Sequence, residues 1–153
     1  MIDYAGAWDE AGVAEFLAEA TIPLRLACRT PGSHLWMVSL WFRHRDGRLE
    51  CATGRDADVV RYLRSDPGVA FEVSTNDPPY RGVRGRGTVE IEPDPEKAVL
   101  RDLLERYLGG TDSRLARRLL DEGREEVTLR IDPAKVYSWD FSDRMHDVAR
   151  EGE

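Results

Sequence analysis

The alternation of short apolar runs with turn residues between residues 35 and 91 constrains the fold of this chain most. Residues 35–45 and 48–53 both alternate, and the Asp46-Gly47 pair between them is typical of tight β-hairpins. Residues 69–75 alternate in the same way, and residues 83–92 form a further, glycine-rich run. Alternation with a period of two predicts strands, and the short connections favour antiparallel pairing.

Helical patterns flank and interrupt these strands in four places. Their predicted starts carry capping or first-turn residues, at Asp9, Asp56, Asp94 and Ser113. An apolar stripe follows each start and predicts one face packed against the strands. Because strands outnumber helices, the sequence predicts a mainly β protein with helices (α+β). The predicted architecture is a six-stranded antiparallel barrel with the helices outside it.

Residues 35–42 are largely apolar on both faces of the predicted strand. This pattern predicts a central strand that is covered on both sides. Towards the end of the chain, residues 127–131 and 136–141 read as two strands with a turn at Asp132-Pro133. The two-sided apolarity of residues 35–42 exceeds what one small barrel needs. We therefore expect a homodimer with an apolar interface near this strand and the last one.

Length and charge limit the class of protein. The chain has 153 residues, so one domain covering 1–153 is expected, with 143–153 as a loosely held charged tail. The net charge of −7 argues against nucleic acid as a partner. No apolar run approaches the roughly 20 residues that span a bilayer. The acidic N-terminal segment argues against export, so a cytoplasmic protein is expected. Lysine is rare beside arginine, which fits a GC-rich coding sequence or a salt-adapted host equally well.

Neither a metal centre nor a nucleophilic triad is expected from the residue types. His34, His44 and His146 do not show metal-ligand spacing, and no serine has the context of a nucleophile elbow. Cys28 and Cys51 lie in strand-like runs, where a cysteine usually acts as a small buried hydrophobe. The sequence assigns no catalytic residue.

A strand end, a Thr53-Gly54 turn and a helix start with Arg55 and Arg61 form a plausible anion cradle. Backbone N–H groups at a helix N-terminus favour phosphate, and arginines can bind it with two hydrogen bonds. The same residues are also compatible with ordinary turn and surface-helix chemistry. The glycine-rich run at 81–87 looks like an RNA-binding box, but in this acidic chain a sheet strand is the better interpretation.

The succession of these motifs resembles the FMN-binding split β-barrel family related to pyridoxamine 5'-phosphate oxidase. The resemblance extends from about residue 14 to residue 141, and its short motifs are Gly32, 39–42, 53–55, Arg61, Leu63, 66–67, Val69, 79–83 and Trp139. It implies a split barrel and a dimer with a flavin in a groove shared by both subunits. It also implies that Ser39 and Trp41 run beside the isoalloxazine ring.

The resemblance further implies roles for the remaining site residues. The cofactor phosphate is expected to meet Thr53, Gly54, Arg55 and Arg61, and Tyr80 and Arg81 would reach in from a loop, across the dimer. Trp139 has the position of an aromatic residue near the cofactor edge, and a tryptophan at the rim of a subunit contact is an equally good interpretation.

One departure from the family pattern concerns the phosphate. Val59 stands where the family places a basic residue, and Asp56 and Asp58 flank it with negative charge. We therefore expect weak cofactor binding. The resemblance implies a flavin-dependent oxidoreductase that uses FMN, or alternatively a deazaflavin, and transfers hydride to or from a small-molecule substrate. The alternative is a non-catalytic split-barrel dimer that has lost tight flavin binding and holds no cofactor.

Overall fold

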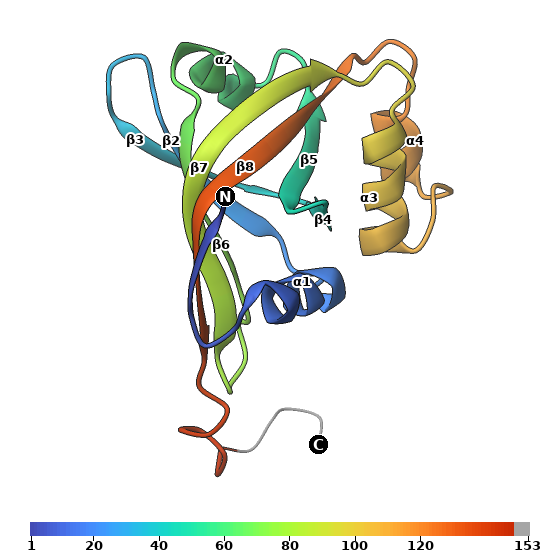
Figure 1. Cartoon of the computed structure of the whole chain (residues 1–153). Coiled ribbons are helices and arrows are strands. Elements are labelled where there is room, and N and C mark those ends of the chain that lie inside the picture. Colours follow the sequence, from blue (N-terminus) through green and yellow to red (C-terminus); the bar gives the residue numbers. More distant parts are fainter. Residues whose placement is uncertain (149–153) are drawn as a thin grey trace.

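A mainly antiparallel sheet and four helices make up the fold, an α+β arrangement seen in a computed structural model that describes residues 1–148 (Figure 1). In chain order the elements are β1 (Asp3–Gly6), α1 (Glu10–Glu19), β2 (Leu24–Arg29), β3 (Leu35–Leu40), β4 (Arg43–Arg45), β5 (Arg48–Gly54), α2 (Asp58–Ser65), β6 (Gly68–Ser74), β7 (Arg81–Pro93), α3 (Ala98–Leu108), α4 (Arg114–Leu119) and β8 (Glu126–Asp140).

The strands pair in the order β3-β2-β6-β7-β8-β5-β4, and β1 adds to β8 as the one parallel pair among the described residues. The two ends of this order, β3 and β4, follow each other in the chain and are separated only by Trp41 and Phe42. The sheet therefore curls until its ends approach each other. No β3–β4 ladder closes it among the described residues.

The sheet has eight strands rather than the predicted six. The hairpin at Asp46-Gly47 forms, but the long run before it divides into β3 and β4. The two predicted strands at 127–131 and 136–141 form one strand, β8, which ends at Asp140, so the predicted turn at Asp132-Pro133 was wrong. A register shift opposite Arg86 and Gly87 accommodates this proline within the ladder. The strand β1 was not predicted, because its four residues show no clear alternation of apolar and polar side chains.

The expectation that residues 35–42 form a covered central strand was also wrong. β3 lies at one end of the pairing order, and Leu35 and Met37 are 77% and 66% exposed. Their neighbours Trp36, Val38 and Leu40 pack against the core instead. Two apolar faces therefore do not make a strand central, because one face of an edge strand can remain uncovered in a single chain.

The first helix, α1, and the last, α4, begin with the predicted capping residues. The side chain of Asp9 accepts from the N–H of Gly12 at 2.9 Å, and that of Ser113 accepts from the N–H of Ala116 at 3.0 Å. Asp94 accepts from the first N–H groups of α3, although the helix itself begins at Ala98. α2 begins at Asp58 rather than Asp56, and no side chain caps it.

The main core lies between the concave face of the curled sheet and the apolar stripes of α1 and α2. A second, smaller cluster lies under α3 and α4, where Leu100, Leu104 and Ala116 pack beside Trp41. Cys28 and Cys51 are buried, and burial raises the pKa of the Cys51 thiol to about 12. None of the helices in residues 1–148 has the length and apolarity that crossing a membrane requires. The predicted tail falls partly at 149–153, outside the described residues.

Candidate functional site

Four of the predicted site residues line one hollow, which we call the Thr53 hollow. Ser39 lies at the end of β3 and Trp41 directly after it, and Thr53 and Gly54 come from the end of β5. Leu100 and Leu103 of α3 and Leu119 of α4 form the apolar wall opposite. The hollow has a volume of about 250 Å³ and opens beside the loop that leads into α2.

Two charged residues that the sequence analysis did not single out also line the Thr53 hollow, Arg124 and Glu126. Gly54 pairs with Glu126 in the β5–β8 ladder, and Arg124 Nη2 lies 3.6 Å from where a Cβ on Gly54 would be. Arg124 Nη2 donates to Glu126 Oε1 at 3.2 Å, and only 2% of the Glu126 side chain is exposed. Both residues lie in a charged run far from Thr53 in sequence, so only the ladder register identifies them.

Trp41 is held firmly at the edge of this hollow. Its ring stacks on that of Tyr107, with centroids 5.1 Å apart and an interplanar angle of 8°. The Tyr107 hydroxyl donates to the carbonyl of Ile22 at 2.9 Å and accepts from the N–H of Phe42 at 3.3 Å. Burial raises the pKa of Tyr107, so the hydroxyl keeps its proton at neutral pH. One face of Trp41 is therefore used by Tyr107, and its orientation is fixed.

Arg55 and Arg61, the predicted phosphate ligands, are exposed and paired with carboxylates. Arg55 bonds to Glu125, and Arg61 Nη2 lies 3.2 Å from Asp58 Oδ1, one helical turn away. The hydrogen bond from Arg55 to Glu125 raises the pKa of the guanidinium. Both side chains of each pair are more than half exposed, and exposed pairs of this kind are weak. Each arginine can therefore exchange its carboxylate for another anion at little cost.

Val59 is 3% exposed and packs in the core with Val60 and Leu63. The position at which the family pattern has a basic residue thus contributes only an apolar side chain. Together with the buried carboxylate of Glu126, this leaves the Thr53 hollow without an unpaired cation on its lining. Its hydroxyls can bond to the polar edge of a ring or to a phosphate, and Glu126 neutralises the cation of its lining, Arg124.

The remaining predicted residues, Tyr80, Arg81 and Trp139, lie at the other end of β7 and β8. Thr53 pairs with Val127 of β8, whereas Gly82 pairs with Trp139, 12 residues later in the same strand. At about 3.3 Å per residue this separates the two groups by roughly 40 Å along the strand. One small cofactor therefore cannot contact both groups within a single chain.

Arg81 serves the packing of that far end. Its guanidinium lies 5.8 Å from the centroid of the Phe16 ring, and it faces Asp140 across the β7–β8 ladder. Burial acts to raise the pKa of Asp140, but hydrogen bonds from Ser142 and the charge of Arg81 outweigh it and lower the pKa. Trp139 packs closely over Gly82, where an added Cβ would come within 2.7 Å of its ring.

Within residues 1–148 no three His, Cys, Asp or Glu side chains gather as a metal site would require. No family model and no curated protein matches the chain. Several solved structures do match the chain. A conserved hypothetical protein from Mycobacterium tuberculosis superposes with a TM-score of 0.73 and 26% identity, over 88% of this chain and 86% of that one.

A protein named F420 reductase superposes with a TM-score of 0.68 and 27% identity, over 80% of this chain and 94% of that one. A putative pyridoxamine 5'-phosphate oxidase from Listeria innocua gives 0.63 at 15% identity, over 84% and 96%. The last likeness is one of fold alone. Together these neighbours support the predicted resemblance to the pyridoxamine 5'-phosphate oxidase-like proteins, at low sequence identity.

Proposed function

We propose that this protein is an oxidoreductase that binds a flavin-type cofactor at the Thr53 hollow and transfers hydride to or from a small organic substrate. The observation that carries the proposal is the convergence of Ser39, Trp41, Thr53 and Gly54 on one hollow. The likeness to an F420 reductase and to a FAD-binding protein from Mesorhizobium loti supports it. FMN and a deazaflavin are the two candidate cofactors, and F420 is a deazaflavin.

The residues of the hollow bind and orient in this proposal. The hydroxyls of Ser39 and Thr53 offer hydrogen bonds to the polar edge of a ring, and Trp41, held by Tyr107, offers an apolar wall. Arg55 turns from Glu125 to the cofactor phosphate, which the weakness of the exposed pair permits. The bound cofactor supplies the hydride chemistry, and the protein supplies position and exclusion of water.

A homodimer would reunite the two groups of predicted residues. Tyr80, Arg81 and Trp139 lie roughly 40 Å along β8 from Thr53 within one chain, so a second copy must bring them to the cofactor. The exposed side chains of Leu35 and Met37 on β3 are suited to such a contact. Asp140 competes with the cofactor for Arg81, so Tyr80 and Trp139 are the better candidates to contact a ring.

A second candidate function is a non-catalytic dimer that has lost tight flavin binding. Two observations favour it: Val59 contributes no charge, and Glu126 places a buried carboxylate inside the hollow. A phosphate there would experience repulsion from Glu126 in a poorly solvated space. This alternative predicts that neither FMN nor a deazaflavin binds in the micromolar range.

Titration of the purified protein with FMN and, separately, with F420 tests these proposals, with cofactor fluorescence as the readout. We expect saturable binding of one cofactor and a loss of about tenfold or more in Arg55→Ala, because a charge-assisted hydrogen bond is removed. Arg64→Ala is the matched control, since it removes the same charge from the last turn of α2. Equal affinities in the two variants would refute the role of Arg55. Binding of neither cofactor at roughly millimolar concentration would favour the non-catalytic alternative.

A further inference from the structure

The Thr53 hollow is small for the cofactor proposed to bind there. Its volume is about 250 Å³. Sites for cofactors and other small molecules usually enclose roughly 300–1,000 Å³. A flavin-type cofactor has a set of fused rings and a long side chain. Such a molecule therefore fits inside the hollow only if one of the walls moves.

Most of the walls are held in place by hydrogen bonds to other elements. β3 and β5 are bonded along their length to β2 and β8. α3 is tied to α1 by the Arg106 guanidinium, which donates to the carbonyls of Leu17 and Ala18 at 2.7 Å and 2.9 Å. α3 is also tied to β4, since Arg43 Nη1 lies 2.7 Å from Asp102 Oδ2. These walls are fixed.

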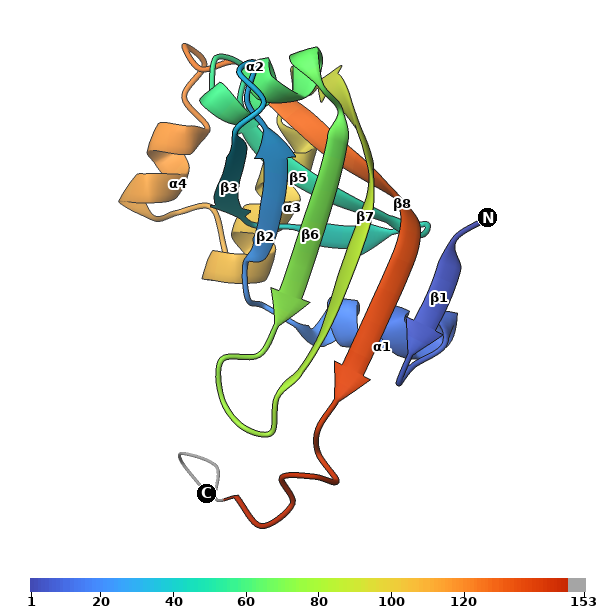
Figure 2. The same ribbon diagram turned by 90° about the vertical axis from the view of Figure 1, so that its left-hand side faces the viewer.

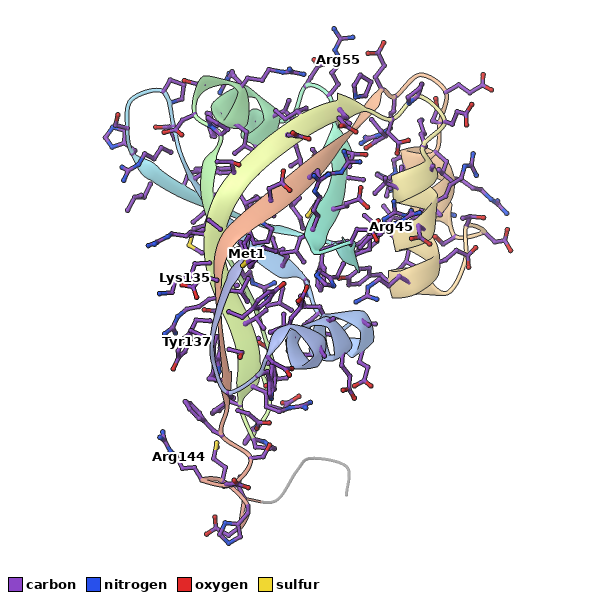
Figure 3. All side chains as sticks on the ribbon, viewed as in Figure 1. Met1, Arg45, Arg55, Lys135, Tyr137 and Arg144 are labelled. Carbon is purple, nitrogen blue, oxygen red and sulfur yellow. The ribbon has the colours of Figure 1, made fainter. Side chains whose placement is uncertain are left out.

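α4, the remaining wall, has no ties of this kind. Within residues 1–148, no hydrogen bond or ion pair joins residues 110–119 to another element. Ala116 is the one fully buried residue of this six-residue helix, and its three arginines are exposed. Figure 3 shows side chains on the outer side of α4 pointing away from the molecule. α4 is therefore held by apolar packing alone.

The apolar packing under α4 is limited and separate from the main core. Ala116 packs against Leu100 and Leu104 of α3, beside Trp41. Leu119 is partly buried and lines the Thr53 hollow. Figure 2 shows α4 at the left-hand edge of the molecule, away from the main core. Moving α4 away from α3 would thus expose this small cluster, widen the hollow and leave the main core intact.

The chain on both sides of α4 is suited to a hinge. Gly109 ends α3 with a φ of +75°, and an added Cβ at Gly109 or Gly110 would meet no atom within 4 Å. The backbone can pivot there without a clash. At the other end, the Lys97 ammonium donates to the carbonyl of Asp121 and fixes the chain directly after α4. The segment between these two points, 110–120, can therefore move as one body.

We propose that residues 110–120 form a hinged flap, whose movement away from α3 widens the Thr53 hollow and admits the cofactor. The inference rests on the proposed function for the identity of the ligand. The movement itself belongs to the free protein and can be measured without any cofactor. Local opening of this kind costs less free energy than unfolding of the whole chain, because few apolar contacts are lost.

Labelling of an introduced thiol measures the movement. Leu104 is 0% exposed and lies under the flap, so the thiol in Leu104→Cys becomes accessible when the flap opens. The native thiols of Cys28 and Cys51 lie in the main core and report opening of the sheet. With iodoacetamide and mass spectrometry, we expect the introduced thiol to react about a hundredfold or more faster than either native thiol. Saturating FMN or F420, whichever binds, should slow this reaction about tenfold or more.

Two further variants separate flap opening from damage by the substitution. Leu26→Cys makes the same change at a 0% exposed position in the main core, and its thiol should react as slowly as the native ones. Ala116→Cys places a thiol on the flap itself with little change in volume, and its thiol should react as fast as that of Leu104→Cys.

Each contrary result has its own meaning. A thiol in Leu104→Cys or Ala116→Cys that reacts as slowly as Cys51 would overturn the flap, whether or not a cofactor binds. Fast labelling that a bound cofactor leaves unchanged would overturn the admission of the cofactor by the flap, and cofactor binding would stand. Binding of neither cofactor would refute the proposed function and, with it, the admission of a cofactor.

Discussion

The Thr53 hollow differs from a second hollow in how the chain builds it. This second hollow, which we call the sheet-face hollow, has a volume of about 510 Å³ and lies on the outer face of β3, β2, β6, β7 and β8. The first is lined largely by the ends of two strands, and its central residues are neighbours in sequence, such as Thr53 and Gly54. The second is lined by one to three residues from each of five strands, brought together by ladder register. The first has its charges paired, with Arg124 bonded to Glu126, whereas the second is lined by three arginines and one carboxylate, together with Lys135, which pairs with Asp3 at 3.8 Å. A local motif thus supplies the central residues of the polar hollow, whereas the charged hollow depends throughout on long-range pairing.

Replacing a glycine of each hollow by alanine should give the largest difference between the two hollows, measured as a loss of unfolding free energy. An alanine Cβ at Gly85, in the sheet-face hollow, would lie 2.4 Å from the carbonyl oxygen of Lys135 and 2.6 Å from Phe71 Cζ. Because backbone must move, we expect Gly85→Ala to lower the free energy of unfolding by about 2 kcal/mol or more, measured by urea denaturation.

Gly54→Ala in the Thr53 hollow is the comparison variant. Its Cβ would meet only Arg124 Nη2 at 3.6 Å, an ordinary contact, so a change within about 0.5 kcal/mol is expected. Gly110→Ala, with no atom within 4 Å, is the control for the substitution itself. Similar losses of unfolding free energy in Gly85→Ala and Gly54→Ala would show that the backbone is packed equally tightly at the two hollows.

This difference also explains how far the sequence could predict the structure. Strand alternation, the Asp46-Gly47 hairpin and the caps at Asp9 and Ser113 depend on local residues, and all of them are present. Of the nine predicted site residues, Ser39, Trp41, Thr53 and Gly54 lie together, although their function remains a proposal. Asp56 as a helix start was wrong by two residues, since α2 begins at Asp58.

What the sequence could not predict depends on pairing partners. Leu35 and Met37 look like core residues in the sequence, yet the edge position of β3 leaves them exposed. Pro133 looks like a turn residue, yet the register shift at Gly87 keeps it inside β8. Glu126 and Arg124 enter the Thr53 hollow only because β8 pairs with β5. Each of these outcomes requires knowledge of a partner strand that is distant in sequence.

The variant Glu126→Gln tests how the charge of the Thr53 hollow affects cofactor affinity. Removing the buried carboxylate should raise FMN affinity on the order of threefold to tenfold, because one repulsion of the cofactor phosphate is lost and Arg124 becomes available. Fluorescence titration measures the change, and Glu15→Gln, exposed on α1, is the control. An unchanged FMN affinity in Glu126→Gln would show that the cofactor phosphate does not lie near Glu126.

The smallest expected effect concerns pH and the far end of β8. The pKa of Asp140 lies below the ordinary value of an aspartate, because hydrogen bonds from Ser142 and the charge of Arg81 outweigh the effect of burial. Such a carboxylate stabilises the fold above its unfolded-state pKa, and the contribution is lost as pH falls through the folded-state pKa.

Asp140→Asn should therefore flatten the loss of stability in the acidic range below about pH 4, by about half a kcal/mol at most, since the site is largely solvated. Thermal denaturation across this pH range measures the effect, and Asp143→Asn, at an exposed position, is the control. Identical pH profiles for the wild type and Asp140→Asn would contradict the assignment.

The pairing of β1 with β8 has a consequence for how the protein is made. Tyr4 lies beside Val136, and the N–H of Trp8 donates to the Ser138 hydroxyl at 2.9 Å, so the first strand synthesised bonds to the last. β5 and β7 also take β8 as a partner. On the ribosome, β1, β5 and β7 therefore each lack hydrogen-bond partners along one edge until β8 emerges. Completion of the sheet is then a late event that requires every residue up to Asp140 to have emerged.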